Sequence, residues 1–197
     1  MLLQRHLLSA VAAAMVLASA FVVHAADPFT LTSTTFKDGQ MMPRKVAAST
    51  ANLSSPNCVG ENVSPQFSWT GVPEGTKSFA LLMEDPESRG ASGVHHWVAY
   101  GIPASVTSFA EGEVSKPSDK YVAGKSTLGV GTYFGPCTPP GTPHHYTFII
   151  VATDLEPTEL PPGLTREELL AKITPPAPAK SHAKGSAGLV GLFVKPQ

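Results

Sequence analysis

Two stretches of the sequence combine carboxylates with polar aromatic rings in a way that could bind an anion. The first contains Asp85, Glu87 and His96, and the second contains His144 and Tyr146, which are two residues apart. Carboxylates close to a histidine favour its charged form. A protonated imidazole beside a tyrosine hydroxyl would suit a phosphate or carboxylate ligand. We expect one polar pocket if the fold brings the two stretches together.

A loop rich in glycine and proline precedes the second stretch and could add donors to this pocket. It covers residues 133–143, and backbone N–H groups at Gly135 and its neighbours could form a concavity of the kind that binds anions. In this hypothesis the carboxylates of Asp85 and Glu87 orient and charge the nearby imidazoles. Those imidazoles, the Tyr146 hydroxyl and the loop N–H groups would hold the anion.

Metal-based and catalytic alternatives have weaker support in the sequence. A metal could use His96, His144 and a carboxylate, but no two ligands have i, i+4 spacing. The G-x-S-x-G motif of a serine hydrolase is absent from the sequence. Asp85 and Glu87 are only two residues apart, whereas the two carboxylates of a glycosidase flank the substrate ~5 to 9 Å apart. We therefore expect a binding protein, with no catalytic residue, cofactor or metal.

Two short runs predict the strands that carry these side chains. Residues 79–83 are apolar, as in a buried strand, and Pro86 beyond them cannot donate to a β-ladder. Residues 144–152 are aromatic and β-branched, which also favours a strand. Because side chains alternate along a strand, His144 and Tyr146 would share one face.

Residues 95–100 predict a further strand that stops at 101–103. The same alternation would place His96, Val98 and Tyr100 on one face of it. An acidic strand end would then be followed by a histidine near the start of the next strand.

The remaining patterns predict short elements joined by many turns, which indicates a mainly antiparallel β protein. Thr165 and Glu168 have the spacing of a helical capping box, so we expect a short helix that ends before Pro175. A proline- and lysine-rich segment at 175–188 is expected to be flexible. Further expectations are strands at 29–36, 66–69 and 189–194, an extended piece at 43–47, and loops at 52–65 and 104–132.

Length and composition limit the class of protein. The chain of 197 residues suggests one domain. Residues 1–25 have the positive start, apolar centre and small-residue end of a secretory signal, which would leave residues 26–197 as the mature domain and no membrane span. An uncleaved membrane anchor is the alternative, although the apolar run is just under the ~20 residues that a span needs. The net charge is −1, and the sequence has no cluster of basic residues, so we do not expect nucleic acid as a partner. In a secreted protein we expect the two cysteines, Cys58 and Cys137, to pair; two free thiols are the alternative.

Several separated motifs resemble one known family. They are Asp85-Pro86-Glu87, His95-His96-Trp97-Val98, Gly101-Ile102-Pro103, and the run from Gly135-Pro136-Cys137 to His144-His145-Tyr146. In this order they resemble the phosphatidylethanolamine-binding protein family, in particular its bacterial, Raf-kinase-inhibitor-like branch of the YbhB/YbcL type. The likeness covers residues from about 29 to 194.

This resemblance implies a single β-rich domain with a large central antiparallel sheet, a smaller sheet and one or two short helices. It also implies a small pocket for phosphate-type groups that binds rather than catalyses. Carried over residue by residue, the pocket would hold Asp85, His96, Gly135, Pro136, His144 and Tyr146. The chain departs from the usual Asp-Pro-Asp-Ala-Pro, because it has Glu87, Ser88 and Arg89 at the last three positions.

Together these observations predict a secreted or periplasmic binding protein for a small anionic, phosphate-bearing ligand such as a phospholipid head group. The alternative is an interaction protein that inhibits a protease or kinase through exposed loops such as 104–132. A hydrolytic or metal-dependent enzyme is the third possibility.

Overall fold

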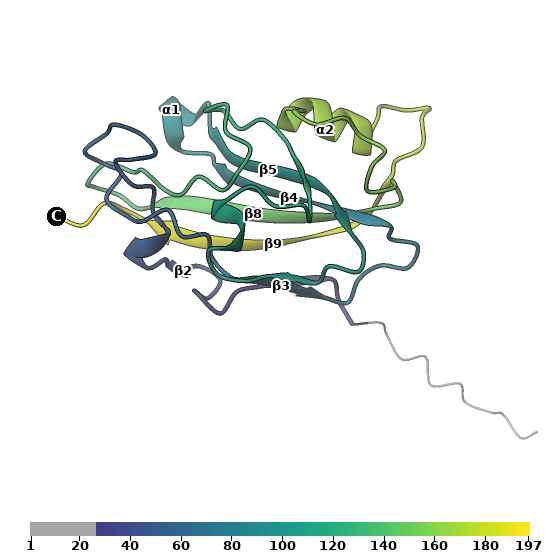
Figure 1. Cartoon of the computed structure of the whole chain (residues 1–197), viewed down its shortest axis with the longest axis horizontal. Coiled ribbons are helices and arrows are strands. Elements are labelled where there is room, and N and C mark those ends of the chain that lie inside the picture. The colour runs from purple at the N-terminus through teal and green to yellow at the C-terminus, as the bar shows by residue number, and fades with distance from the viewer. Residues whose placement is uncertain (1–26) are drawn as a thin grey trace, which may run out of the picture.

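The structure is a computed structural model that describes residues 27–197, in which two β-sheets pack face to face (Figure 1). The signal sequence expected at residues 1–25 lies outside the described residues. The larger sheet has six strands, in the order β2 (Gln40–Met41), β9 (Ala183–Phe193), β8 (His144–Thr153), β4 (Ser78–Asp85), β5 (Val94–Pro103) and β7 (Val122–Ala123). All its pairs are antiparallel except that of β2 with β9.

A smaller antiparallel sheet covers one face of the larger one. It contains β1 (Thr30–Thr32), β3 (Phe67–Thr70) and β6 (Ser108–Phe109). The main core lies between the sheets, where the Trp69 ring packs against Phe79 and Phe109, and Phe67 packs against Phe148. The expected fold class, with one large sheet, one smaller sheet and short helices, is confirmed.

Helix α2 (Arg166–Ile173) packs on the other face of the large sheet. It begins as expected, because the Thr165 hydroxyl accepts from the Glu168 N–H and the Glu168 carboxylate accepts from the Thr165 N–H. Its buried residues Leu169 and Ile173 belong to a second apolar cluster with the strands beneath. The other helical segments are short turns: α1 (Ser88–Ala91), η1 (Arg44–Val46) and η2 (Glu113–Ser115).

Several expected boundaries were wrong. The first strand covers only Thr30–Thr32, and the segment expected to be extended at 43–47 contains a turn of 3-10 helix. Strand β5 continues through Gly101, whose positive φ of 61° lets the chain bulge while pairing resumes at Ile102. The region 104–132, which was expected to be a loop, contains three short elements: β6, η2 and β7.

The last strand begins six residues earlier than its sequence pattern predicts. Ala183 already pairs with Thr153, so 183–188 belong to the sheet, although they were expected to be flexible. This half of β9 is built from small residues and a lysine, and it lacks the apolar alternation that marks a strand in sequence. Strand β8 has ten residues whose backbone groups need a partner strand. Pairing with β8 therefore makes residues 183–188 a strand, although their own sequence pattern is weak.

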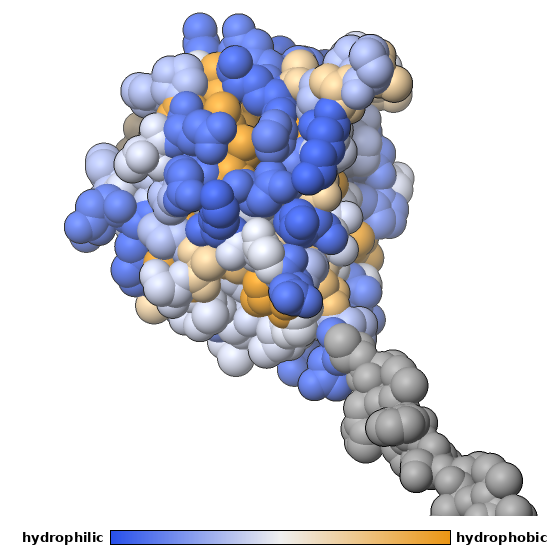
Figure 2. Space-filling view, turned by 90° about the vertical axis from the view of Figure 1, so that its right-hand side faces the viewer, coloured by the Kyte–Doolittle hydropathy of each residue, from blue (hydrophilic) through white to orange (hydrophobic). Residues whose placement is uncertain are grey.

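The two ends of the sandwich are far apart. Thr30 pairs with Thr70 at the end where Asp27 lies, and β4 starts near this end and finishes at the opposite one (Figure 1). Figure 2 looks onto the Asp27 end, where the surface is largely hydrophilic with smaller hydrophobic patches between. No helix within residues 27–197 has the length and apolar character needed to cross a bilayer.

Candidate functional site: a pocket at one end of the large sheet

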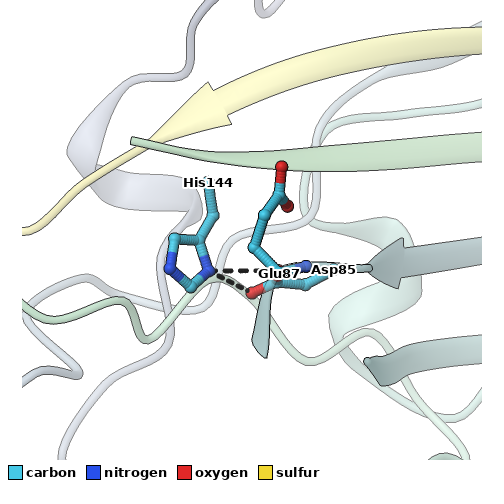
Figure 3. A group of neighbouring side chains, drawn as sticks. All are labelled: Asp85, Glu87 and His144. Atoms are coloured by element: carbon cyan, nitrogen blue, oxygen red, sulfur yellow. Dashed lines mark hydrogen bonds and ion pairs between the residues drawn. The ribbon is translucent and has the colours of Figure 1, made fainter. Parts of the chain in front are cut away.

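The end of β4 and the start of β8 meet, as the sequence predicted. Glu84 pairs with Thr147 in the antiparallel ladder, so the next residue, Asp85, lies beside the first residues of strand β8. The His144 Nδ1 atom lies 2.8 Å from Asp85 Oδ2 and 3.0 Å from Oδ1 (Figure 3). A carboxylate can only accept, so this imidazole carries a proton on Nδ1.

Asp85 also holds the turn that follows β4. Its Oδ1 accepts from the N–H groups of Glu87 and Ser88, both at 3.1 Å, and its Oδ2 accepts from the Ser88 hydroxyl at 2.8 Å. The side chain is only 1% exposed. Burial by itself would raise the pKa of Asp85, but the hydrogen bonds from His144 and Ser88 outweigh it and hold the pKa below its ordinary value. Asp85 is therefore a buried carboxylate that keeps its charge.

A β-bulge turns His96 toward Asp85. Met83 pairs with Trp97 but Glu84 pairs with His95, which leaves His96 as an extra residue in β5. Extra residues of this kind re-aim side chains next to functional sites. The expectation that His96 shares a face with Val98 was wrong: Val98 packs under α2, whereas the His96 ring contacts Tyr146 with ring centroids 5.2 Å apart.

His96 is neutral, contrary to the expectation that nearby carboxylates would charge it. The ring is buried, and burial lowers its pKa to about 4, although the Phe134 carbonyl and the Asp85 charge act in the opposite direction. Its Nδ1 lies 2.9 Å from the Phe134 carbonyl oxygen, which can only accept. The proton is therefore on Nδ1, and Nε2 carries a lone pair.

Acidification should destabilise the fold through His96. Between pH 6.5 and 4 the unfolded chain would bind a proton that the folded chain refuses, so the free energy of unfolding falls as the pH falls. The loss over this window is roughly 3 kcal/mol. Urea denaturation of wild type and His96→Asn at pH 7 and 4.5 measures it. The variant should lose most of the pH dependence, whereas His182→Asn should keep it; equal slopes for all three proteins would contradict the assignment.

Tyr146 completes the buried part of the site. It follows His144 by two positions on β8 and belongs to the core cluster between the sheets. Its hydroxyl shares a short hydrogen bond with the Thr138 hydroxyl, in which either oxygen can donate. Burial raises the pKa of the Tyr146 phenol far above its ordinary value, so the group is a neutral hydroxyl.

These side chains line a pocket of about 210 Å³. Its floor is formed by buried residues: Asp85, His96, Phe134 and Tyr146. Its mouth is formed by more exposed residues: Leu53, Arg89 and Leu128. The volume is below the ~300 Å³ at which pockets for drug-sized ligands begin, so a small group fits best.

Four of the seven predicted ligand-binding residues do not line this pocket: Glu87, Gly135, Pro136 and His144. The expectation that Glu87 orients His96 or His144 was wrong. Its carboxylate lies 2.6 Å from Nδ1 of His145 and is turned away from the Asp85–His144 contact (Figure 3).

Gly135 and Pro136 shape the loop behind the site. The Gly135 N–H donates to Asn62 Oδ1 at 2.8 Å, so it is not a free donor as expected. A Cβ at position 135 would lie 2.0 Å from the Val46 carbonyl oxygen, which explains the glycine. The Pro136 carbonyl accepts from the Ala48 N–H at 2.8 Å. Ligand binding by any of the seven residues stays a prediction.

The two cysteines pair, as predicted. Cys58 and Cys137 form a disulfide with an S–S distance of 2.05 Å across 79 residues of sequence. Cys137 lines the pocket, and so do Leu53 and Ser55 on the loop that carries Cys58. The disulfide therefore ties together the two loops that form one wall of the site.

Asp85, Glu87 and His144 are the described residues whose ligand atoms lie close enough for a metal ion, all within 4.8 Å. The set differs from the one considered in the sequence, which included His96. The oxygens of Asp85 already accept several hydrogen bonds, and Glu87 pairs with His145. We assign no metal to this group, and its absence stays a prediction.

Three residues that matter to the site were not predicted from the sequence. Ser88 bonds to Asp85 through both its N–H and its hydroxyl, Asn62 anchors the loop behind the pocket, and Arg89 lies at the mouth. The departure at positions 87–89 from the usual family pattern was the only signal for Arg89. The positive φ of Asn62, 58°, is invisible in a single sequence.

Comparisons with known proteins agree with the motif pattern. Residues 32–187 match the model of a family described as phosphatidylethanolamine-binding protein. The chain belongs to the phosphatidylethanolamine-binding protein family. Its relatives support the YbhB/YbcL-type branch named from the motifs.

Three relatives illustrate the similarity. YbcL of Escherichia coli is 35% identical over 144 residues, covering 70% of this chain and 76% of YbcL. Its crystal structure aligns with a TM-score of 0.71 at 29% identity, over 84% of this chain and 98% of that one. The crystal structure of the homologue CT736 from Chlamydia trachomatis gives 0.69 at 30% identity, over 85% and 98%. The protein named as lipoprotein LppC of Mycobacterium tuberculosis is 34% identical over 170 residues, 86% of this chain and 74% of LppC.

Proposed function

We propose that this protein binds small phosphate-bearing ligands, such as phospholipid head groups, in the pocket floored by Asp85, His96 and Tyr146. The observation that carries the proposal is a hollow at a strand end whose floor combines buried hydrogen-bonding groups. Concave pockets in which a few polar groups converge are typical of ligand sites. We also propose that the protein binds its ligand without transforming it.

The neutral state of His96 defines how such a ligand would meet the floor. Its Nε2 offers a lone pair, so a phosphate oxygen that carries a proton would donate to it. The hydroxyl pair of Tyr146 and Thr138 can donate to another ligand oxygen. The Asp85 charge is balanced by donors from Ser88 and His144, which limits its repulsion of an anion.

The mouth of the pocket suits the non-phosphate part of a ligand. Leu53 and Leu128 are 41% and 36% exposed and both line the pocket. Exposed apolar side chains at the rim of a polar site provide contact area for an organic substituent. This combination favours a phosphate ester over inorganic phosphate alone.

We place the protein outside the cytoplasm, in the periplasm or secreted. The Cys58–Cys137 disulfide supports this, because such bonds persist in oxidising compartments. The relative LppC, which is named as a lipoprotein, supports it as well. Partner binding through residues 104–132, the alternative function, stays a prediction.

Titration of isotope-labelled protein with O-phosphoethanolamine tests the proposal. The imidazole signals of His96 should shift at millimolar ligand, because its Nε2 faces the phosphate. His182, which pairs with Asp154 outside the pocket, is the internal control and should not move. Ethanolamine, which lacks the phosphate, should leave both rings unchanged. Unchanged His96 signals at saturating O-phosphoethanolamine would reject the proposed function.

A further inference from the structure

The pocket floor supplies no net positive charge for the phosphate proposed above. Asp85 is an ionised carboxylate, and its pKa lies below the ordinary value. His96 and Tyr146 are both neutral, because burial disfavours their charged forms. The floor therefore carries one negative charge. A ring N–H and two backbone N–H groups stabilise this charge by hydrogen bonds, but they add no surplus positive charge. An anion needs another attraction to enter this space.

Arg89 is the one lysine or arginine among the residues that line this pocket in the described chain. Its side chain is exposed at the mouth. None of the ion pairs formed within residues 27–197 involves it. The guanidinium is therefore available to a ligand.

The backbone that carries Arg89 is held in an uncommon conformation. Three successive residues have positive φ: Arg89 at 52°, Gly90 at 64° and Ala91 at 68°. Two of them are not glycine, and such conformations cost energy and cluster at ligand sites. The start of this turn is fixed by the hydrogen bonds from Glu87 and Ser88 to Asp85. The same carboxylate that lines the floor thus sets the direction of the chain toward Arg89.

We propose that Arg89 is the specificity-determining residue of the pocket, and that its guanidinium holds the anionic oxygens of a phosphate group whose protonated oxygen faces His96. This inference rests on the proposed function. A guanidinium can bind two phosphate oxygens at once, which an ammonium cannot do in the same geometry. The arrangement selects singly protonated phosphate groups over neutral and cationic ligands.

Calorimetric titrations of Arg89→Gln, Arg89→Lys and wild type with inorganic phosphate and with O-phosphoethanolamine test the inference. Arg89→Gln should weaken both ligands about tenfold to 100-fold, and Arg89→Lys should lie between it and wild type. Lys116→Gln, which removes an exposed charge outside the pocket, should bind as wild type does. Raising the salt concentration should weaken wild type more than Arg89→Gln, because the variant has lost the charge that salt screens.

The outcomes separate the two proposals. If wild type binds and Arg89→Gln binds equally well with the same salt dependence, the role of Arg89 is rejected and the proposed function stands. If wild type binds neither ligand, the proposed function itself fails. If Arg89→Gln loses binding of inorganic phosphate alone, Arg89 recognises only the free anion. If the variant loses binding of both ligands, Arg89 recognises the phosphate group that they share.

Discussion

Replacing Asp85 by alanine should reduce the free energy of unfolding by about 4 kcal/mol, as expected when a buried charged partner is removed from its donors. The carboxylate is almost fully buried and accepts from two backbone N–H groups, from the Ser88 hydroxyl and from His144. Alanine leaves these donors without an acceptor inside the protein. The turn that carries Arg89 loses its anchor as well, so phosphate binding should disappear together with the stability.

Urea denaturation of Asp85→Ala and of Asp154→Ala gives a matched comparison. Asp154 also bonds to a histidine, His182, at 2.8 Å, but both side chains are partly exposed. Its removal should therefore have a much smaller effect, as is usual for surface pairs. Similar losses in the two variants would show that burial and the turn hydrogen bonds of Asp85 do not matter.

The second large effect should come from removing the disulfide with Cys58→Ser and Cys137→Ser together. The bond closes a loop across 79 residues, and the entropy of the unfolded chain then predicts a loss of about 4 kcal/mol. Because the bond joins two loops that line the pocket, binding of O-phosphoethanolamine should weaken under conditions where the variant is still folded.

Denaturation with and without a reducing agent provides the control. Wild type should lose stability when reduced, whereas the double variant should give the same curve under both conditions. If reduction leaves the wild-type midpoint unchanged, the disulfide contributes nothing to the fold.

Much of the fold was predictable because its signals are local. The capping box at Thr165 fixes the start of α2, and the apolar runs at 79–83 and 144–152 lie inside strands β4 and β8. The order of the separated motifs indicated the family, and with it the number and relative size of the sheets. Even the meeting of Asp85 with His144 followed from the positions of two strand ends.

The details of the site depend on information that a single sequence does not contain. A bulge at His96 reverses the face given by simple alternation, and nothing in residues 95–100 marks it. The charge of His96 depends on burial by distant segments, in particular on Phe134. The Glu87 side chain could have reached either of two histidines at the start of β8. It pairs with His145 because it lies on the side of the strand that His145 faces.

The opposite placement of the pocket and of Asp27 has a practical meaning for any measurement on a surface. A protein attached to a solid support or a bilayer near Asp27 would hold its ligand mouth outward, because the residues that line the pocket follow the far end of β4. Attachment beyond Phe193 would crowd it instead, since Phe193 pairs with His144 beside the site. Immobilisation near Asp27 and immobilisation beyond Phe193 should therefore give different apparent on-rates for the same molecule.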